Sequence, residues 1–151
     1  MKKILIVAAD YYLEISDNLI KGASIHLEKH KNWLEYEIVY SPGSFEVPYI
    51  INKHIDKYDA FIALGCIIRG ETYHFELIAN ECARKIMDLS VDKKKPIGFG
   101  ILTCENLNQA IKRSKVIENS TKRNTGEEAA KACVRTLQEM LYFKIDDINN
   151  G

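Results

Sequence analysis

Short apolar runs alternate along the chain with segments whose apolar residues recur at helical spacing. Continuous apolar character, without strict alternation, is typical of parallel strands that are covered on both faces. The runs that we interpret as strands are residues 4–9, 36–40, 60–68 and 97–102. The pattern therefore predicts a four-stranded parallel sheet.

The segments between and after these runs predict helices, because their apolar residues form one face at a period of 3.6. These faces comprise Leu19, Ile20, Ala23 and Leu27; Val47, Ile50, Ile51 and Ile55; Phe75, Ile78, Ala79, Cys82, Ala83 and Ile86; and Ala130, Cys133, Leu137, Met140 and Leu141. A further short helix is expected at about residues 105–113. The order β-α-β-α-β-α-β-α-α implies right-handed crossovers, and hence one α/β domain over residues 1–151, a three-layer α/β/α sandwich.

The composition of the chain argues against some classes of function. Lysine and arginine number 21, as do aspartate and glutamate, so the formal net charge is zero. A nucleic-acid or anionic-membrane surface normally needs a basic excess, and no apolar stretch approaches the length of a membrane span. The widely spaced cysteines contain no C-x-x-C pair, which favours reduced core residues in a cytoplasmic protein. They are Cys66, Cys82, Cys104 and Cys133.

Aromatic, acidic, hydroxyl and imidazole groups follow the predicted strands. In doubly wound folds ligands bind at the carboxyl ends of the strands, so the loops at residues 9–14, 41–48, 69–74 and 103–110 should carry the chemistry. We therefore expect a small-molecule site at this edge of the sheet.

The loop RGETYH places a glycine where a strand gives way to a helix. Free backbone N–H groups near Gly70, Glu71 and Thr72 would make an anion site, although no Lys-Ser or Lys-Thr follows as in a P-loop. Alternatively, Gly70 only eases the turn and Thr72 caps the helix. His74, in the first helical turn, could shuttle protons or be a structural surface histidine.

The loop SPGSFEVP has a bend at Pro42 and Gly43. Phe45 can offer a flat face to a ring, and Glu46 can accept hydrogen bonds from hydroxyl or ring N–H groups. The alternative interpretation makes Ser44 a helix N-cap and Phe45 a core residue.

Three further features are less specific. Tyr11 and Tyr12 could stack on a heterocycle or merely cover the surface. His26 and His30 have the i, i+4 spacing of a paired metal site, but no third ligand is evident, so we expect no metal. Arg113 lies among other cations, where a single charge is usually just solvated.

Together, these stretches resemble the lumazine synthase family, which catalyses the penultimate step of riboflavin biosynthesis. The matching segments span about residues 4–141 and are PGSFEVP, YDAFIALGCIIRGETYHFE, PIGFGILTCENLNQAIKR and NTGEEAAKA. The resemblance implies a flavodoxin-like fold and a transferase without metal or organic cofactor. The implied reaction condenses 5-amino-6-(D-ribitylamino)uracil with L-3,4-dihydroxy-2-butanone 4-phosphate, giving 6,7-dimethyl-8-ribityllumazine, phosphate and water.

The resemblance also implies residue roles. The residues implied to contact the uracil substrate are Tyr11, Ser44, Phe45, Glu46, Ile67 and Ile68. Those implied to hold phosphate are the backbone groups of Gly70, Glu71 and Thr72, with Arg113 from a neighbouring subunit, whose Phe99 completes the pocket. His74 is implied to be the catalytic proton shuttle.

The chain departs from the family pattern at three places. The family's usual Arg-Phe after the first strand is Asp10-Tyr11, and its NKG element is Asn124-Thr125-Gly126. The loop between Arg113 and Asn124 is also extended. Shared sites imply a homo-oligomer, at least a pentamer. Like charges in the loop, Lys115, Lys122 and Arg123, favour an isolated pentamer over an icosahedral shell, with a face-to-face decamer as the lesser possibility.

Two other functions remain open on the sequence. An archaeal-type riboflavin synthase resembles this family and would use two lumazine molecules. A non-catalytic protein that binds flavin or lumazine would need only the pocket. His74 beside a phosphate-binding turn favours the enzyme that needs a phosphorylated ketose.

Overall fold

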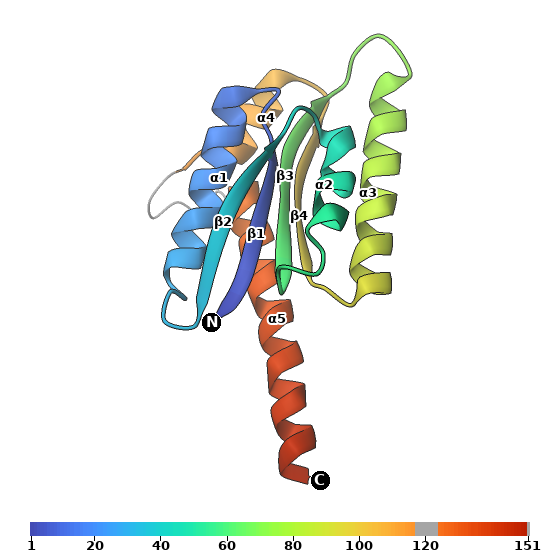
Figure 1. Cartoon of the computed structure of the whole chain (residues 1–151). Coiled ribbons are helices and arrows are strands. Elements are labelled where there is room, and N and C mark those ends of the chain that lie inside the picture. Colours follow the sequence, from blue (N-terminus) through green and yellow to red (C-terminus); the bar gives the residue numbers. More distant parts are fainter. Residues whose placement is uncertain (117–123, 151) are drawn as a thin grey trace.

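Four parallel strands form one sheet in the order β2-β1-β3-β4 (Figure 1). The computed structural model describes residues 1–116 and 124–150, with residues 143–150 described by their backbone only. The strands are β1 (Lys2–Ala9), β2 (Leu34–Ser41), β3 (Ala60–Ile68) and β4 (Ile97–Cys104). The four predicted strands are confirmed, and three of them run a few residues longer than the apolar pattern indicated.

Helices cover both faces of the sheet, which confirms the three-layer α/β/α sandwich. One face carries α1 (Leu13–Glu28), α4 (Leu107–Ser114) and α5 (Thr125–Asn150), and the other carries α2 (Val47–Lys53) and α3 (His74–Lys93). A 3₁₀ turn, η1 (Ser44–Glu46), precedes α2. Within the described residues, no helix is both long and apolar enough to cross a membrane.

Two apolar cores lie on opposite faces of the sheet because successive strand side chains point to opposite sides. Ile4 and Ile6 of β1 pack with α1 and α5, whereas Leu5 and Val7 pack with α2 and α3. Ile55, predicted on the face of the second helix, lies beyond the end of α2 and is nevertheless buried in the second core.

All four cysteines are free and buried, as the sequence predicted. Burial raises the pKa of Cys133 to about 12 and that of Cys82 to about 11. These thiols therefore stay protonated and act as small core residues.

His26 lies on α1, and His30 lies in the turn between α1 and β2. The indole of Trp33 donates to Nδ1 of His30 at 3.2 Å, and the two imidazole rings lie 5.0 Å apart. Burial lowers the pKa of His26, and neighbouring His30 lowers it further. The described residues contain no group of three or more side chains that could hold a metal ion. The observed contacts are those of a structural cluster.

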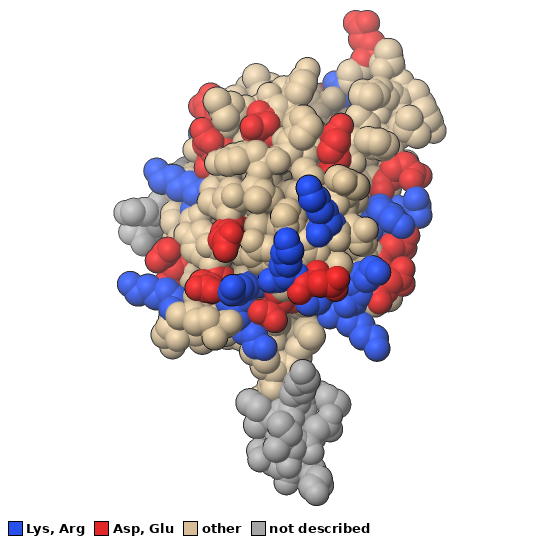
Figure 2. Space-filling view, in the orientation of Figure 1, with Lys and Arg blue, Asp and Glu red and all other residues tan. Residues whose placement is uncertain are grey.

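Acidic and basic side chains intermingle over the lower part of the face seen in Figure 2. This mixing agrees with the zero net charge of the chain. The face shown therefore offers no separate basic surface of the kind that binds nucleic acid.

The Asn124-Thr125-Gly126 segment starts α5 and fastens it to α1. Asn124 is buried, and its Oδ1 accepts from the Glu127 N–H at 3.0 Å. Its Nδ2 donates to the Asn18 carbonyl of α1 at 3.1 Å and to the Ser114 carbonyl of α4 at 2.8 Å. A Cβ added at Gly126 would lie 2.0 Å from the carbonyl oxygen of Leu19. The predicted loop charges Lys122 and Arg123 lie outside the described residues.

We expect Gly126→Ala to lower the free energy of unfolding by about 2 kcal/mol, because overpacking against backbone forces α1 and α5 apart. Urea titration of the purified protein measures this. Gly70→Ala is the matched control, since among the described residues, its two chain neighbours aside, no atom lies within 4 Å of a Cβ placed there. A Gly126→Ala variant as stable as Gly70→Ala would show that the two helices can adjust freely.

Candidate active site

A cavity of about 530 Å³ opens at the carboxyl ends of β1, β2 and β3, beside the first turns of α3. Its lining residues are Tyr11, Tyr12, Pro42, Gly43, Ser44, Phe45, Glu46, Cys66, Ile67, Ile68, His74, Leu77 and Ile78. The cavity therefore brings together seven residues predicted from the sequence: Tyr11, Ser44, Phe45, Glu46, Ile67, Ile68 and His74. Its volume and mostly apolar lining suit a small organic ligand.

The loop after β2 presents both a buried hydroxyl and an exposed ring to this cavity. The Ser41 hydroxyl donates to the Gly43 carbonyl at 2.7 Å and so shapes the turn. Ser44 is only 6% exposed, and its Oγ has no hydrogen-bond partner among the described residues. Phe45 is 57% exposed. The cap positions of η1 and α2 are Gly43 and Glu46. The alternative in which Ser44 caps a helix and Phe45 joins the core is therefore wrong.

Gly65 leaves room for the Ser44 side chain to pack against β3. A Cβ added at Gly65 would lie 2.6 Å from Oγ of Ser44. Only a glycine on β3 therefore lets the turn after β2 approach the sheet this closely. The Ser44 hydroxyl is thus enclosed between the turn and β3, without a hydrogen-bond partner among the described residues.

Two tyrosines close the side of the cavity next to β1. Tyr11 is exposed, and its ring meets that of Tyr12 edge-to-face at 5.0 Å. Tyr12 is half-buried against the core, and burial raises the pKa of its phenol. Tyr12 therefore remains a hydrogen-bond donor at the cavity wall, a position that the family resemblance did not select.

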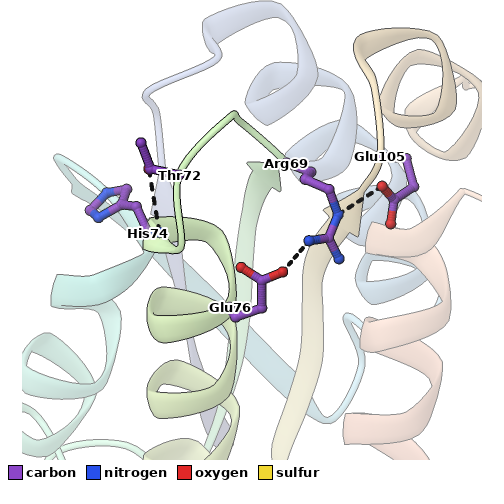
Figure 3. Close-up of polar contacts among 5 residues, drawn as sticks. All are labelled: Arg69, Thr72, His74, Glu76 and Glu105. Atoms are coloured by element: carbon purple, nitrogen blue, oxygen red, sulfur yellow. Dashed lines mark hydrogen bonds and ion pairs between the residues drawn. The ribbon is translucent and has the colours of Figure 1, made fainter.

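His74 is exposed in the first turn of α3 and lines the cavity. Its backbone N–H contacts Oγ1 of Thr72 at 3.4 Å, a weak local bond (Figure 3). Gly70, Glu71 and Thr72 are exposed and do not line the cavity. The turn at residues 70–72 therefore lies outside the cavity and directly precedes His74, which lines it.

The same turn begins with an arginine that is already paired. Arg69 donates to Glu105 at 2.8 Å and to Glu76, and its guanidinium lies 4.5 Å from the centre of the Phe75 ring. Arg69 lowers the pKa of Glu76, and Glu76 and Glu105 raise the pKa of Arg69. These two carboxylates offset the positive charge of Arg69, which lies next to the turn.

A sequence model of a family described as 6,7-dimethyl-8-ribityllumazine synthase matches residues 1–140. The chain belongs to the 6,7-dimethyl-8-ribityllumazine synthase family. Proteins of that name from Bartonella tribocorum and Zymomonas mobilis are each 45% identical to it, over 87% and 89% of this chain and 85% and 93% of their own. The protein of that name from Sphingopyxis alaskensis is 43% identical over 96% of this chain and 99% of its own.

The departures from the lumazine synthase pattern keep the backbone of the site. The Asp10 N–H donates to the Ser41 carbonyl at 3.0 Å, which ties the loops after β1 and β2 together. Tyr11 then occupies the aromatic position and lines the cavity. At this one of the three departures, Asp10 places a carboxylate where the family pattern has an arginine.

Two residues expected in a lumazine synthase site lie away from this cavity. Phe99 is exposed on the edge strand β4, and Arg113 is exposed on α4, where it donates to the Gln109 carbonyl at 3.4 Å. Neither lines the cavity of its own chain. Their predicted roles in the site stay predictions.

Proposed function

We propose that this cavity is where the chain condenses 5-amino-6-(D-ribitylamino)uracil with L-3,4-dihydroxy-2-butanone 4-phosphate. The products are 6,7-dimethyl-8-ribityllumazine, phosphate and water. Family membership supports the activity, a transferase reaction of riboflavin biosynthesis. The observation that carries the assignment of the site is that His74 and the Ser44–Glu46 turn line one cavity, although they lie on separate elements.

The uracil substrate fits the inner half of the cavity. Tyr11 and Phe45 offer exposed aromatic faces for the pyrimidine ring. Ser44 lines the same cavity, next to the place that we assign to the polar edge of the uracil and the ribityl hydroxyls. Glu46 can accept from hydroxyl or N–H groups. The backbone of Ile67 and Ile68, at the end of β3, completes the polar edge.

The phosphate of the second substrate fits the turn before α3. Backbone N–H groups of Gly70, Glu71 and Thr72 precede a helix N-terminus, where the helix dipole favours an anion. Arg69 is paired with two carboxylates, and Glu71 adds another negative charge. The turn therefore needs a cation from elsewhere, and Arg113 of a neighbouring subunit is our candidate.

His74 lies between these two halves and is the group that we assign to proton transfer. An imidazole gains and loses protons near neutral pH. It can therefore serve in Schiff-base formation, in loss of phosphate and in ring closure. No step in this scheme requires a metal or an organic cofactor.

The assembly that we propose is a cyclic homopentamer in which adjacent subunits share each site. Leu77 on α3 and Phe99 on β4 are large apolar residues left exposed in the single chain, and both belong to the face of the sheet that α3 covers. Packing a neighbour there would bury them and bring Phe99 toward another cavity. A cytoplasmic location, supported by the free cysteines, completes the proposal.

The activity is tested by mixing the protein with both substrates and following lumazine absorbance and fluorescence. Appearance of lumazine that depends on both substrates is expected. Conversion of added lumazine into riboflavin would overturn the proposal in favour of a riboflavin synthase. Tight lumazine binding without turnover would overturn it in favour of a carrier.

Light scattering of the purified protein is expected to give a mass near that of five chains. The exposed apolar residues supply the contact, and Lys115 leads into a loop whose like charges disfavour further association. A mass of ten chains would indicate the face-to-face decamer. A sixty-chain particle or a stable monomer would contradict the pentamer.

A further inference from the structure

Arg69 joins three segments at the rim of the site (Figure 3). Its Nε donates to Glu105 at 2.8 Å, in the loop between β4 and α4, and its Nη1 donates to Glu76 in the first turn of α3. The guanidinium also lies over the Phe75 ring, 4.5 Å from its centre. Figure 3 shows this cluster on the opposite side of the turn from the His74 ring.

The backbone of Arg69 is fixed as well. Its N–H donates to the Cys104 carbonyl at 2.8 Å, which continues the pairing of β3 with β4 by one residue. Among the described residues, the turn that follows Arg69 makes only weak contacts. Gly70 has open space around it, and the Thr72–His74 contact is 3.4 Å long.

An isolated exposed ion pair contributes little, because water screens it and two flexible side chains must be ordered. Arg69 differs because one planar guanidinium meets two carboxylates and an aromatic face together, with its side chain 40% exposed. Such a cluster fixes geometry even where its net contribution to stability is small.

We propose that Arg69 is a positioning residue, which braces the first turn of α3 against the loop between β4 and α4. The brace holds His74 toward the cavity and keeps the Gly70–Thr72 turn in its anion-binding conformation. We assign Arg69 no contact with phosphate, because the carboxylates of Glu76 and Glu105 already pair with its Nη1 and Nε and offset its charge. This inference rests on the proposed function.

Arg69→Gln is expected to lower kcat roughly 10-fold, because a small misplacement of a catalytic group carries a large kinetic penalty. KM for the phosphorylated ketose should rise, whereas KM for the uracil substrate should stay within about twofold. Glu105→Gln should shift both parameters in the same direction, although Glu105 does not line the cavity. Arg69→Lys should recover only part of kcat, because lysine lacks the planar fork.

Arg84→Gln is the matched control. Arg84 lies on α3, the helix whose first turn Arg69 contacts, and it also pairs with two carboxylates, Glu81 at 2.8 Å and Asp88 at 3.1 Å. Its side chain is more exposed than that of Arg69 and does not line the cavity. Its kinetics should match those of the unmodified protein. Identical kinetics in Arg69→Gln and Arg84→Gln would overturn the proposal, as would an equal rise in both KM values.

Hydrogen–deuterium exchange tests the brace without substrate. Amides of residues 70–77 should exchange faster in Arg69→Gln than in Arg84→Gln, because the opening of that turn is no longer restrained. Unchanged exchange would overturn the brace. If the unmodified protein forms no lumazine, the proposed function fails, and the exchange comparison still decides whether Arg69 orders the turn.

Discussion

Replacing Arg113 with alanine is expected to lower kcat/KM for the phosphorylated ketose roughly 100-fold, the size of effect that follows from losing charge-assisted hydrogen bonds to phosphate. The reason lies in the charges around the Gly70–Thr72 turn. Arg69 is shared by Glu76 and Glu105, so the turn has no spare cation of its own among the described residues.

Steady-state kinetics with each substrate varied in turn measure this effect. Affinity for the uracil substrate should change by about twofold or less, since its contacts lie in the other half of the cavity. Lys112→Ala, one residue away on the same exposed helix, is the matched control and should retain both affinities. Equal loss of both affinities in Arg113→Ala would instead indicate a damaged subunit interface.

Mixed oligomers test whether Arg113 acts across subunits. We expect Arg113→Ala and His74→Ala chains, each poorly active alone, to regain activity when they are refolded together. About a quarter of the sites in random oligomers would combine an intact His74 with an intact neighbouring Arg113. No recovery would show that each chain supplies both residues to its own site.

His74→Ala is expected to lower kcat by roughly 10- to 100-fold, the usual contribution of a positioned acid–base group to a facile condensation. Folding should be unaffected, because the imidazole is exposed and only the backbone N–H of His74 makes a local bond. Rates under saturating substrates, compared with the thermal midpoint, separate the two effects.

Tyr73→Ala is a suitable control for His74→Ala, because Tyr73 is the adjacent exposed side chain and does not line the cavity. Its turnover should match that of the unmodified protein. Wild-type turnover in His74→Ala would reassign the histidine to a structural role.

Periodicity alone predicted the sheet and its helices because burial on two faces leaves a local signature. The predicted strand 60–68 coincides with β3, whose first eight residues are all buried. Strand 97–102 ended early because Thr103 is polar, whereas pairing of Ile68 with Cys104 carries β4 two residues further. The strand ends depend on the neighbouring strand, which local composition does not report.

For the candidate site too, some residues could be predicted from the sequence and others could not. His74 and the Ser44–Glu46 turn were predicted from residue type and place in the chain, and the structure brings them to one cavity. Tyr12 was left open between a stacking residue and a surface residue, and Ile78 was placed only on the apolar face of a helix. Ile78 lines the cavity because it lies one helical turn after His74 on the same face of α3. This spacing indicates a place in the site only when the position of the cavity is known.

The element order, the buried strands and the turns that carry reactive side chains could be predicted from the sequence, because they follow from local spacing and residue type. Which of these turns meet depends on how the whole chain packs. The order β2-β1-β3-β4 places loops that are distant in sequence side by side. Arg69 thereby reaches Glu105, 36 residues away, through the pairing of β3 with β4, because strand pairing is set by packing of the whole sheet and not by local periodicity.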